Sequence, residues 1–433
     1  MRDLFLSLTI PAALIWALFS AQGSILVLNW LWFQRPYDFA YGTWNTLPLF
    51  KIALGIALLS NLFRGQLRPR VTPLLVIYLM FLCWITISAF FAYDTELAWQ
   101  TYWQYLPSMW IAPILLFATI HDLKFLRMIM WVAAGGVAVN AFKVGVVLTA
   151  AGGGHVTEQI SGFVGDNNGF GLVLCLVVAM LMGLRTTLPN KRWMRFLFYV
   201  FVTFVLLTIV YTQSRGAFAA VGVILFLGSI LSSRPFRNIV IFTAVVLVGY
   251  IAIPAENFER LATISDLSED VSAEGRFENW RLAWQEALEH PLVGVGLENH
   301  IPYNTDVVQP AVQVRVAHNT YLQILGELGF PALVFYLIFI WMGFWSLVRT
   351  WRAMIPVAEK HPDLVWVRDT AFWMVCGYVG YSLGAGLLNM LYIEFPWYAI
   401  FYGSMLLPLV EQELSKRERI PSETAVSNEF EFN

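Results

Sequence analysis

Residues 168–185 read NGFGLVLCLVVAMLMGLR and carry no charge before the final arginine. A run of about 18 apolar residues is long enough to cross the hydrocarbon core of a bilayer as a helix. Comparable runs recur along nearly the whole chain, to about residue 410. Within a bilayer each backbone polar group must be paired inside its own segment, which helices achieve. The sequence therefore predicts an all-α polytopic membrane protein.

The composition excludes several other classes of protein. Hydrophobic residues make up 58% of the 433 residues and charged residues only 13%, against about 25% charged in a soluble domain. This rules out a soluble enzyme, a disordered chain and a disulfide scaffold. The 27 basic and 29 acidic residues nearly balance, so no nucleic-acid partner is implied. The three cysteines lie far apart in apolar runs, where we expect core residues without a redox or metal role.

The apolar runs predict about twelve transmembrane helices in three sections and a tail. We expect about nine spans in residues 1–253, a periplasmic loop domain at 254–329, about three spans in 330–410, and a disordered cytoplasmic tail at 411–433. The first span is long enough to need a bend at Pro11 or a partly re-entrant course. The expected spans lie near 4–33, 46–63, 71–92, 101–119, 126–150, 168–185, 196–212, 216–232, 238–253, 330–349, 370–391 and 396–410.

The distribution of Lys and Arg predicts the orientation. Most of these residues fall in one alternating set of connections that includes both termini, and the positive-inside rule makes that side cytoplasmic. In a bacterial inner membrane the loop 254–329 would then be periplasmic. Several cations lie on this disfavoured side, and binding an anion would explain them. The chain lacks a nucleotide-binding P-loop and metal-binding motifs, so we expect no cofactor, no metal and an activated substrate.

Two arginines on the outer side are candidates for binding phosphate oxygens. Arg215 lies in the tight turn Thr212-Gln213-Ser214-Arg215-Gly216-Ala217 between two spans, where a planar guanidinium can grip phosphate. The alternative is contact with lipid headgroups or a loop carboxylate.

Arg276 opens an amphipathic helix that Pro291 should end. A cation at a helix start is disfavoured by the helix dipole, so its presence needs another explanation. The helix would lie on the membrane or on the spans. Its neighbour Arg281 can instead form a surface pair with Glu278.

His318 is the candidate base. It should lie at the start of a helix beginning near Asn319 or Thr320 and leading into the span at 330–349. Nearby arginines would lower its pKa and keep the imidazole neutral, so that it can accept a proton. A structural histidine is the alternative reading. We assign substrate-binding roles to a further set: Asn319, Tyr321, Arg315, Asn168, Gly294, Gly296 and Glu327.

Members of that set have simpler explanations too. Gly294 and Gly296 suggest backbone that passes close to another group, or a plain turn. Asp166 or Asn167 could cap a helix next to Asn168. Glu327 could orient His318 or cap a turn, and Lys143 is a further candidate cation without motif support.

One base and two or three arginines suffice for one type of chemistry. A sugar linked through pyrophosphate to a lipid already carries a good leaving group, and guanidinium groups can stabilise the departing charge without a metal. The acceptor hydroxyl then needs only a base. Attack from the face opposite the leaving group would invert the anomeric configuration.

The order of these motifs resembles the O-antigen ligase and polymerase family of bacterial membrane glycosyltransferases. The resemblance rests on Ser214-Arg215-Gly216-Ala217, Arg276 with Trp280, Pro291-x-x-Gly294-x-Gly296, and His318-Asn319-x-Tyr321-Leu322 before a span. It implies an undecaprenyl-pyrophosphate-linked donor, periplasmic inverting transfer without a metal, His318 as base, and Arg215 and Arg276 as pyrophosphate ligands. The N-terminal portion also resembles the O-glycosylation ligase subgroup associated with exosortase systems.

The sequence leaves the acceptor open: a lipid core, a second lipid-linked repeat unit in a polymerase, or a protein hydroxyl. Two other functions compete with glycan transfer. A transporter or flippase for lipid-linked glycans should show ionisable residues at mid-depth and repeated halves, and neither is evident. A non-catalytic envelope subunit would not need cations around a boundary histidine.

Overall fold

The computed structural model describes residues 2–39, 44, 46–156, 165–232, 235–236, 271–307 and 314–429. The described part is helical and has no strand, which confirms the all-α prediction. The expected span at 238–253 lies outside the described residues. The main helices are α1 (Arg2–Phe19), α2 (Ala21–Phe33), α3 (Leu49–Phe63), α4 (Pro73–Phe90), α5 (Thr95–Tyr105), α6 (Ala112–Thr119), α7 (Leu123–Ala150), α8 (Asn167–Leu184), α9 (Arg192–Tyr211), α10 (Arg215–Ile230), α13 (Val271–Glu289), α14 (His300–Val307), α15 (Thr320–Lys360), α16 (Val365–Ala385) and α17 (Phe395–Glu429).

Among the described residues, five helices are both long and apolar enough to cross a membrane: α4, α7, α8 with the turn after it, α9 and α15. Shorter apolar helices occur at α1, α3 and α10. The protein is therefore a helical membrane protein. The count of twelve spans stays a prediction.

The first expected span consists of two helices, and its break lies at Ser20 instead of Pro11. The Ser20 hydroxyl accepts a hydrogen bond of 2.9 Å from the backbone N–H of Gly23 and caps α2. The turn is tight, because a Cβ at position 23 would lie 2.8 Å from the Trp16 ring. Pro11 stays inside α1.

The expected span at 101–119 is interrupted by a π-helical turn at Leu106–Ile111. Pro107 has no N–H to donate, so the regular ladder of backbone bonds is broken there. Tyrosine hydroxyls from other helices donate to the carbonyl groups of this turn: Tyr398 to Ser108 at 2.7 Å, and Tyr78 to Met109. These tyrosine side chains thus supply the backbone carbonyl groups with hydrogen bonds that lipid could not provide.

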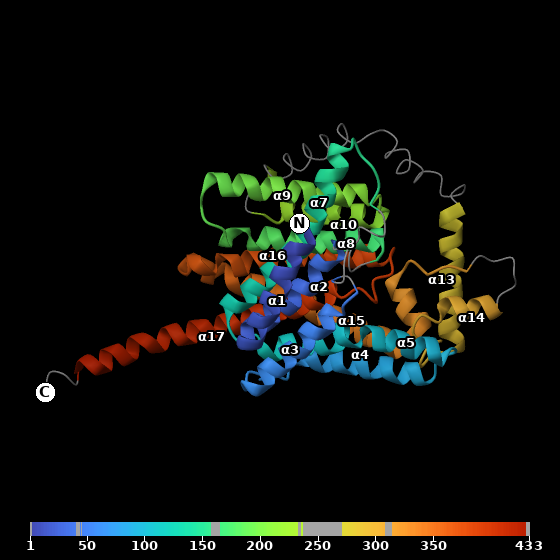
Figure 1. Ribbon diagram of the computed structural model, residues 1–433, viewed down its shortest axis with the longest axis horizontal. Helices are drawn as coiled ribbons and strands as arrows, with labels where there is room; N and C mark the ends of the chain where they lie inside the picture. Colours follow the sequence, from blue (N-terminus) through green and yellow to red (C-terminus); the bar gives the residue numbers. More distant parts are fainter. Residues whose placement is uncertain are drawn as a thin grey trace.

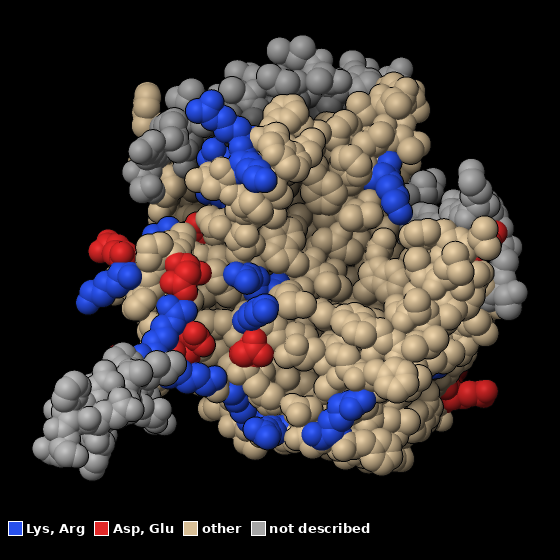
Figure 2. Space-filling view, turned by 60° about the vertical axis from the view of Figure 1, so that its left-hand side comes forward, with Lys and Arg blue, Asp and Glu red and all other residues tan. Residues whose placement is uncertain are grey.

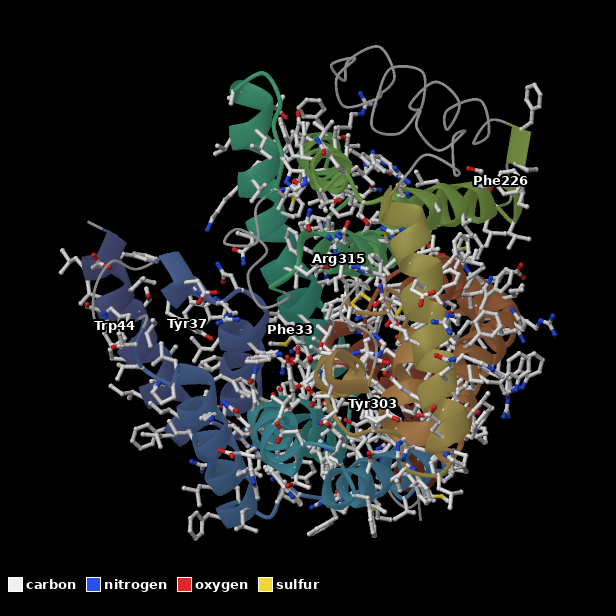
Figure 3. All side chains as sticks on the ribbon, turned by 90° about the vertical axis from the view of Figure 1, so that its right-hand side faces the viewer. Phe33, Tyr37, Trp44, Phe226, Tyr303 and Arg315 are labelled. Atoms are coloured by element: carbon white, nitrogen blue, oxygen red, sulfur yellow. The ribbon has the colours of Figure 1, made fainter. Side chains whose placement is uncertain are left out.

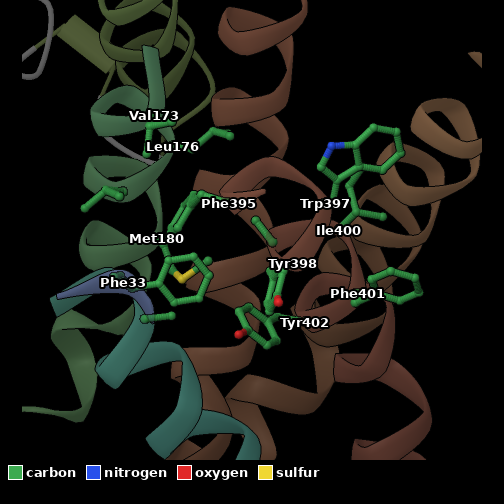
Figure 4. Packing of buried hydrophobic residues seen from close by; sticks show 14 of the residues in the cluster. Phe33, Val173, Leu176, Met180, Phe395, Trp397, Tyr398, Ile400, Phe401 and Tyr402 are labelled. Atoms are coloured by element: carbon green, nitrogen blue, oxygen red, sulfur yellow. The ribbon is translucent and has the colours of Figure 1, made fainter. Parts of the chain in front are cut away.

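The apolar stretch quoted first, now α8, is the most enclosed of the candidate spans. α7, α9, α10 and α16 pack around it. A second part of the core is aromatic: Phe33 makes edge contacts with Phe395 at 5.4 Å and with Tyr398 at 5.1 Å between ring centroids (Figure 4). These contacts tie the N-terminal helices to α17 and fix the central bundle.

Helix α13 lies crosswise to α4, α5 and α9 and stands at one end of the bundle (Figure 1). It begins at Val271, so Arg276 lies inside the helix and does not open it as predicted. Its end at Glu289, just before Pro291, is as expected. The side packed on the protein includes Leu282, Ala283 and Ala287. Other large apolar side chains of this amphipathic helix face outward, since Phe277, Trp284 and Leu288 are exposed.

The opposite end of the molecule carries the C-terminal part of α17 (Figure 1). Lys and Arg side chains gather over this end (Figure 2). Here α17 continues as a helix to Glu429, where a disordered tail was expected from residue 411. The ion pairs of Arg417 with Glu413, at 3.2 Å, and with Asp363, at 2.7 Å, support its exit from the bundle.

Candidate active site

The segment before α15 holds His318 in a defined backbone conformation. Asn319 caps α15, and its side-chain oxygen accepts from the N–H groups of Tyr321 and Leu322 at 3.0 and 3.1 Å. His318 has a positive φ of 48°, which is uncommon for a non-glycine residue. The predicted helix start and the position of His318 directly before it are therefore confirmed.

The loop between α16 and α17 supports this segment from one side. The Asn319 N–H donates to Asn389 Oδ1 at 3.0 Å. The Thr320 hydroxyl donates to the Leu388 carbonyl at 2.6 Å and accepts from the Met390 N–H at 2.9 Å. The cap of α15 is thus bonded to residues far along the chain.

Helix α13 supports the same segment from another side. The Trp280 indole Nε1 donates to the Ala317 carbonyl at 2.7 Å, and Asn279 Oδ1 accepts from the Arg315 N–H at 2.8 Å. Arg276 lies one helical turn before Trp280. Figure 3 shows Arg315 beside the first half of α13 and Tyr303 beside its second half. This packing brings Arg276 towards His318.

Arg215 is the first residue of α10, whose N-terminus packs near the same segment. Ser214 caps this helix by accepting from the Ala217 N–H at 3.3 Å. Gly216 packs on the loop after α16, because a Cβ there would lie 3.2 Å from Leu388 Cδ1. The N-termini of α10 and α15 therefore pack on one loop. This relationship was not predictable from the sequence.

The electrostatics of His318 agree with a neutral base. Burial of the imidazole lowers its pKa below the usual 6.5, and the charges of Arg276 and Arg315 lower it further. Asp166 acts in the opposite direction. His318, two arginines and Asp166 thus share one electrostatic neighbourhood, built from α8, α13 and the segment before α15.

Three residues predicted to bind substrate, Gly294, Gly296 and Glu327, contact protein. A Cβ at Gly294 would lie 2.3 Å from the Glu327 carbonyl carbon, and one at Gly296 would lie 2.3 Å from Ala92 Cβ. Both glycines serve close backbone packing instead. The Glu327 carboxylate is buried and accepts from Gln323, Tyr392 and the Glu298 N–H. It therefore does not orient His318.

The other predicted substrate-binding residues have structural contacts as well. The Tyr321 hydroxyl donates to the Ser382 carbonyl at 2.8 Å. Asn168 donates to Asn167 Oδ1 at 3.3 Å next to the helix cap formed by Asp166, which is the simpler explanation given above. Arg315 is exposed and acts on His318 through its charge.

The sequence did not predict a buried cluster of polar side chains at α13, formed by Glu286, His300 and Asn304. His300 Nδ1 lies 2.7 Å from Glu286 Oε1, and its Nε2 donates to the Arg315 carbonyl at 3.1 Å. Asn304 donates to the same Glu286 oxygen. Glu286 and His300 are 1% and 5% exposed, so their polar atoms depend on one another. In the sequence His300 comes four residues after Gly296, and no spacing pattern links it to Glu286.

The pair of Arg281 with Glu278 is confirmed. Arg281 Nε donates to Glu278 Oε2 at 3.0 Å on the exposed side of α13. The pair lowers the pKa of Glu278 through hydrogen bonding. Arg281 is thus a surface residue, whereas Arg276 on the same helix acts on His318.

Comparison with known families gives a match over the same elements. Residues 198–337 match the family described as O-antigen ligase. The chain contains an O-antigen ligase domain. Arg215, Arg276 and His318 all lie within it, and Asn168 lies outside. Residues 1–194 match a family of unknown function. A search of curated proteins gives no match.

The match supports a membrane activity of the O-antigen ligase and polymerase type, which handles glycans. Within the described part of the chain, no group of three or more His, Cys, Asp or Glu side chains could hold a metal ion. The chemistry available at the site is proton transfer at His318 and binding of negative charge by guanidinium groups.

Proposed function

We propose that the protein transfers a glycan from an undecaprenyl-pyrophosphate-linked donor to an acceptor hydroxyl. In this proposal His318 deprotonates the hydroxyl as it attacks the anomeric carbon, and the pyrophosphate leaves with the bonding electrons. Arg215 and Arg276 bind the leaving group. Attack opposite the leaving group inverts the configuration, and no metal takes part.

The observation that carries the proposal is the placement of the His318 segment against α13, the helix that bears Arg276, where burial and the charges of Arg276 and Arg315 lower the pKa of the imidazole. A histidine that only bound phosphate would bind it more strongly when protonated, whereas a base must be neutral to accept a proton. Arg276, one of the two arginines that lower this pKa, can also bind a diphosphate. The site thus serves both proton transfer from the acceptor hydroxyl and binding of the leaving pyrophosphate.

The proposed location is the bacterial inner membrane, with the site periplasmic and both termini cytoplasmic. Support comes from the gathering of Lys and Arg at the end opposite α13 (Figures 1 and 2). The acceptor is a lipid core, another glycan or a protein. A protein acceptor would correspond to the O-glycosylation ligase subgroup that the sequence resembles. A polymerase of repeat units would use the same site.

The test is consumption of lipid-linked glycan by purified protein and by a His318→Ala variant. We expect a loss of about 100-fold or more with normal membrane insertion. Transfer at the wild-type rate would exclude His318 as the base. Mass spectrometry of envelope glycoconjugates with and without the protein identifies the acceptor, and unchanged glycoconjugates would contradict the proposal.

A further inference from the structure

A cavity of about 380 Å³ lies between the start of α4, the end of α6, α15 and α17. It is at the cation-rich end of the bundle, and α13 stands at the other end (Figures 1 and 2). The cavity is therefore separate from the His318 site. None of the residues discussed above for glycan transfer lines it.

The lining has a polar part and an apolar part. The polar part includes Arg70, Arg349 and Glu411, together with hydroxyl groups of serine and threonine. The apolar part includes Phe117 and Met342, with Trp345, which is 44% exposed at the surface of the bundle. A ligand that fits this lining has a charged head and a hydrocarbon chain.

The two arginines differ from Arg368 and Arg417 at the same end of the molecule. Arg368 pairs with Asp369 and Arg417 pairs with Asp363. In the described part of the chain, neither Arg70 nor Arg349 forms an ion pair.

Arg70 donates to the neutral side chain of Gln412 at 3.0 Å, which leaves its charge uncompensated. With Glu411 the cavity therefore has an excess of one positive charge.

We propose that this cavity binds an anionic phospholipid. The guanidinium groups bind the phosphate and the negative headgroup, and the first part of an acyl chain lies along Phe117 and Met342. Basic pockets between membrane helices are typical sites for anionic headgroups. Planar guanidinium groups bind phosphate oxygens through paired hydrogen bonds. The bound lipid would link α4 to α15 and α17, independently of the glycan reaction.

The test compares lipid binding by the full chain and by an Arg70→Gln/Arg349→Gln variant. Detergent-purified protein is titrated with phosphatidylglycerol or with phosphatidylcholine of the same acyl chains, and bound lipid is measured by native mass spectrometry. We expect phosphatidylglycerol binding to weaken by about tenfold or more in the variant, with phosphatidylcholine unchanged. Equal binding of phosphatidylglycerol by both proteins would overturn the proposal.

The matched control is Arg192→Gln/Arg195→Gln, which removes two exposed arginines at the start of α9 on the same end. This control variant should bind phosphatidylglycerol as the wild type does. If it lost as much binding as the Arg70→Gln/Arg349→Gln variant, the effect would come from general surface charge and the proposal would be wrong. Free inorganic phosphate should not displace the lipid, whereas displacement would indicate an anion site without lipid preference.

A second measurement does not depend on the stability of the double variant. A photoreactive benzoylphenylalanine at Met342 should cross-link to phosphatidylglycerol in vesicles that contain equal amounts of both lipids. Cross-linking to both lipids in equal yield would contradict a site for anionic lipid.

Discussion

The indole Nε1 of Trp280 donates a hydrogen bond of 2.7 Å to the carbonyl oxygen of Ala317, the residue before His318. This bond joins α13, which carries Arg276, to the segment that carries the proposed base. Ala317 is 2% exposed, so its carbonyl has little access to water. Together with the bond from the Arg315 N–H to Asn279, this side chain of α13 sets the relative position of cation and base.

Replacing Trp280 by Phe should impair transfer without removing any proposed catalytic group. The variant loses the donor to Ala317, and a small displacement of His318 would lower the rate by about 10- to 100-fold. The measurement is consumption of lipid-linked glycan. Trp284→Phe on the same helix is the control, because Trp284 is 47% exposed, and it should retain activity. Equal rates for both variants would show that the Trp280 bond does not position His318.

The rate should fall on the acid side as His318 becomes protonated. Its pKa is below 6.5 because of burial and of the charges of Arg276 and Arg315, so the acid limb of the rate profile should lie below pH 6.5. Arg315→Gln removes a charge that lowers this pKa. The pKa should rise, and the acid limb should move to higher pH. An unshifted limb in this variant would contradict the proposed electrostatic contact.

Two arginines on α13 provide a matched comparison. Arg276→Gln should lower transfer by about 100-fold, as expected when a group that stabilises the leaving charge is lost. Arg281→Gln should have little effect, because Arg281 pairs with Glu278 on the exposed side of the helix. The measurement is the transfer rate of both variants at one pH. A larger loss of rate for Arg281→Gln than for Arg276→Gln would show that Arg281, and not Arg276, binds the leaving group.

Gly326→Ala should destabilise the protein through the buried polar cluster at α13. A Cβ at position 326 would lie 2.3 Å from Glu286 Oε2 and disturb its contact with His300. We expect a cost of about 1–3 kcal/mol, observed as a lower unfolding temperature. Gly222→Ala is the control, because no atom lies within 4 Å of its Cβ position. If both variants unfold at the same temperature, α13 and α15 are not packed as described.

Transfer should continue in the presence of EDTA. The proposed mechanism assigns stabilisation of the leaving pyrophosphate to arginine side chains, which need no metal. The measurement is the initial rate with and without the chelator, followed by added Mg²⁺ or Mn²⁺. Loss of activity that a divalent ion restores would exclude transfer by guanidinium groups alone.

Some local features could be predicted because they depend on neighbouring residues. The start of α15 at Thr320, the end of α13 before Pro291 and the pair of Arg281 with Glu278 follow from caps and from helical spacing. The break at Ser20 was placed wrongly at Pro11. Pro11 lies inside α1, and the Ser20 hydroxyl instead caps α2 by accepting from the Gly23 N–H.

The sequence by itself determined that this is a helical membrane protein with an O-antigen ligase motif order, because hydropathy and motif spacing are properties of contiguous residues. Only the tertiary structure decided which polar residues meet. Glu327 and the two glycines looked suited to a substrate, but they pack on protein, while Trp280, Asn389 and His300 hold the segment around His318. These contacts join residues far apart in the chain, and the packing of helices, not their individual sequences, brings such residues together.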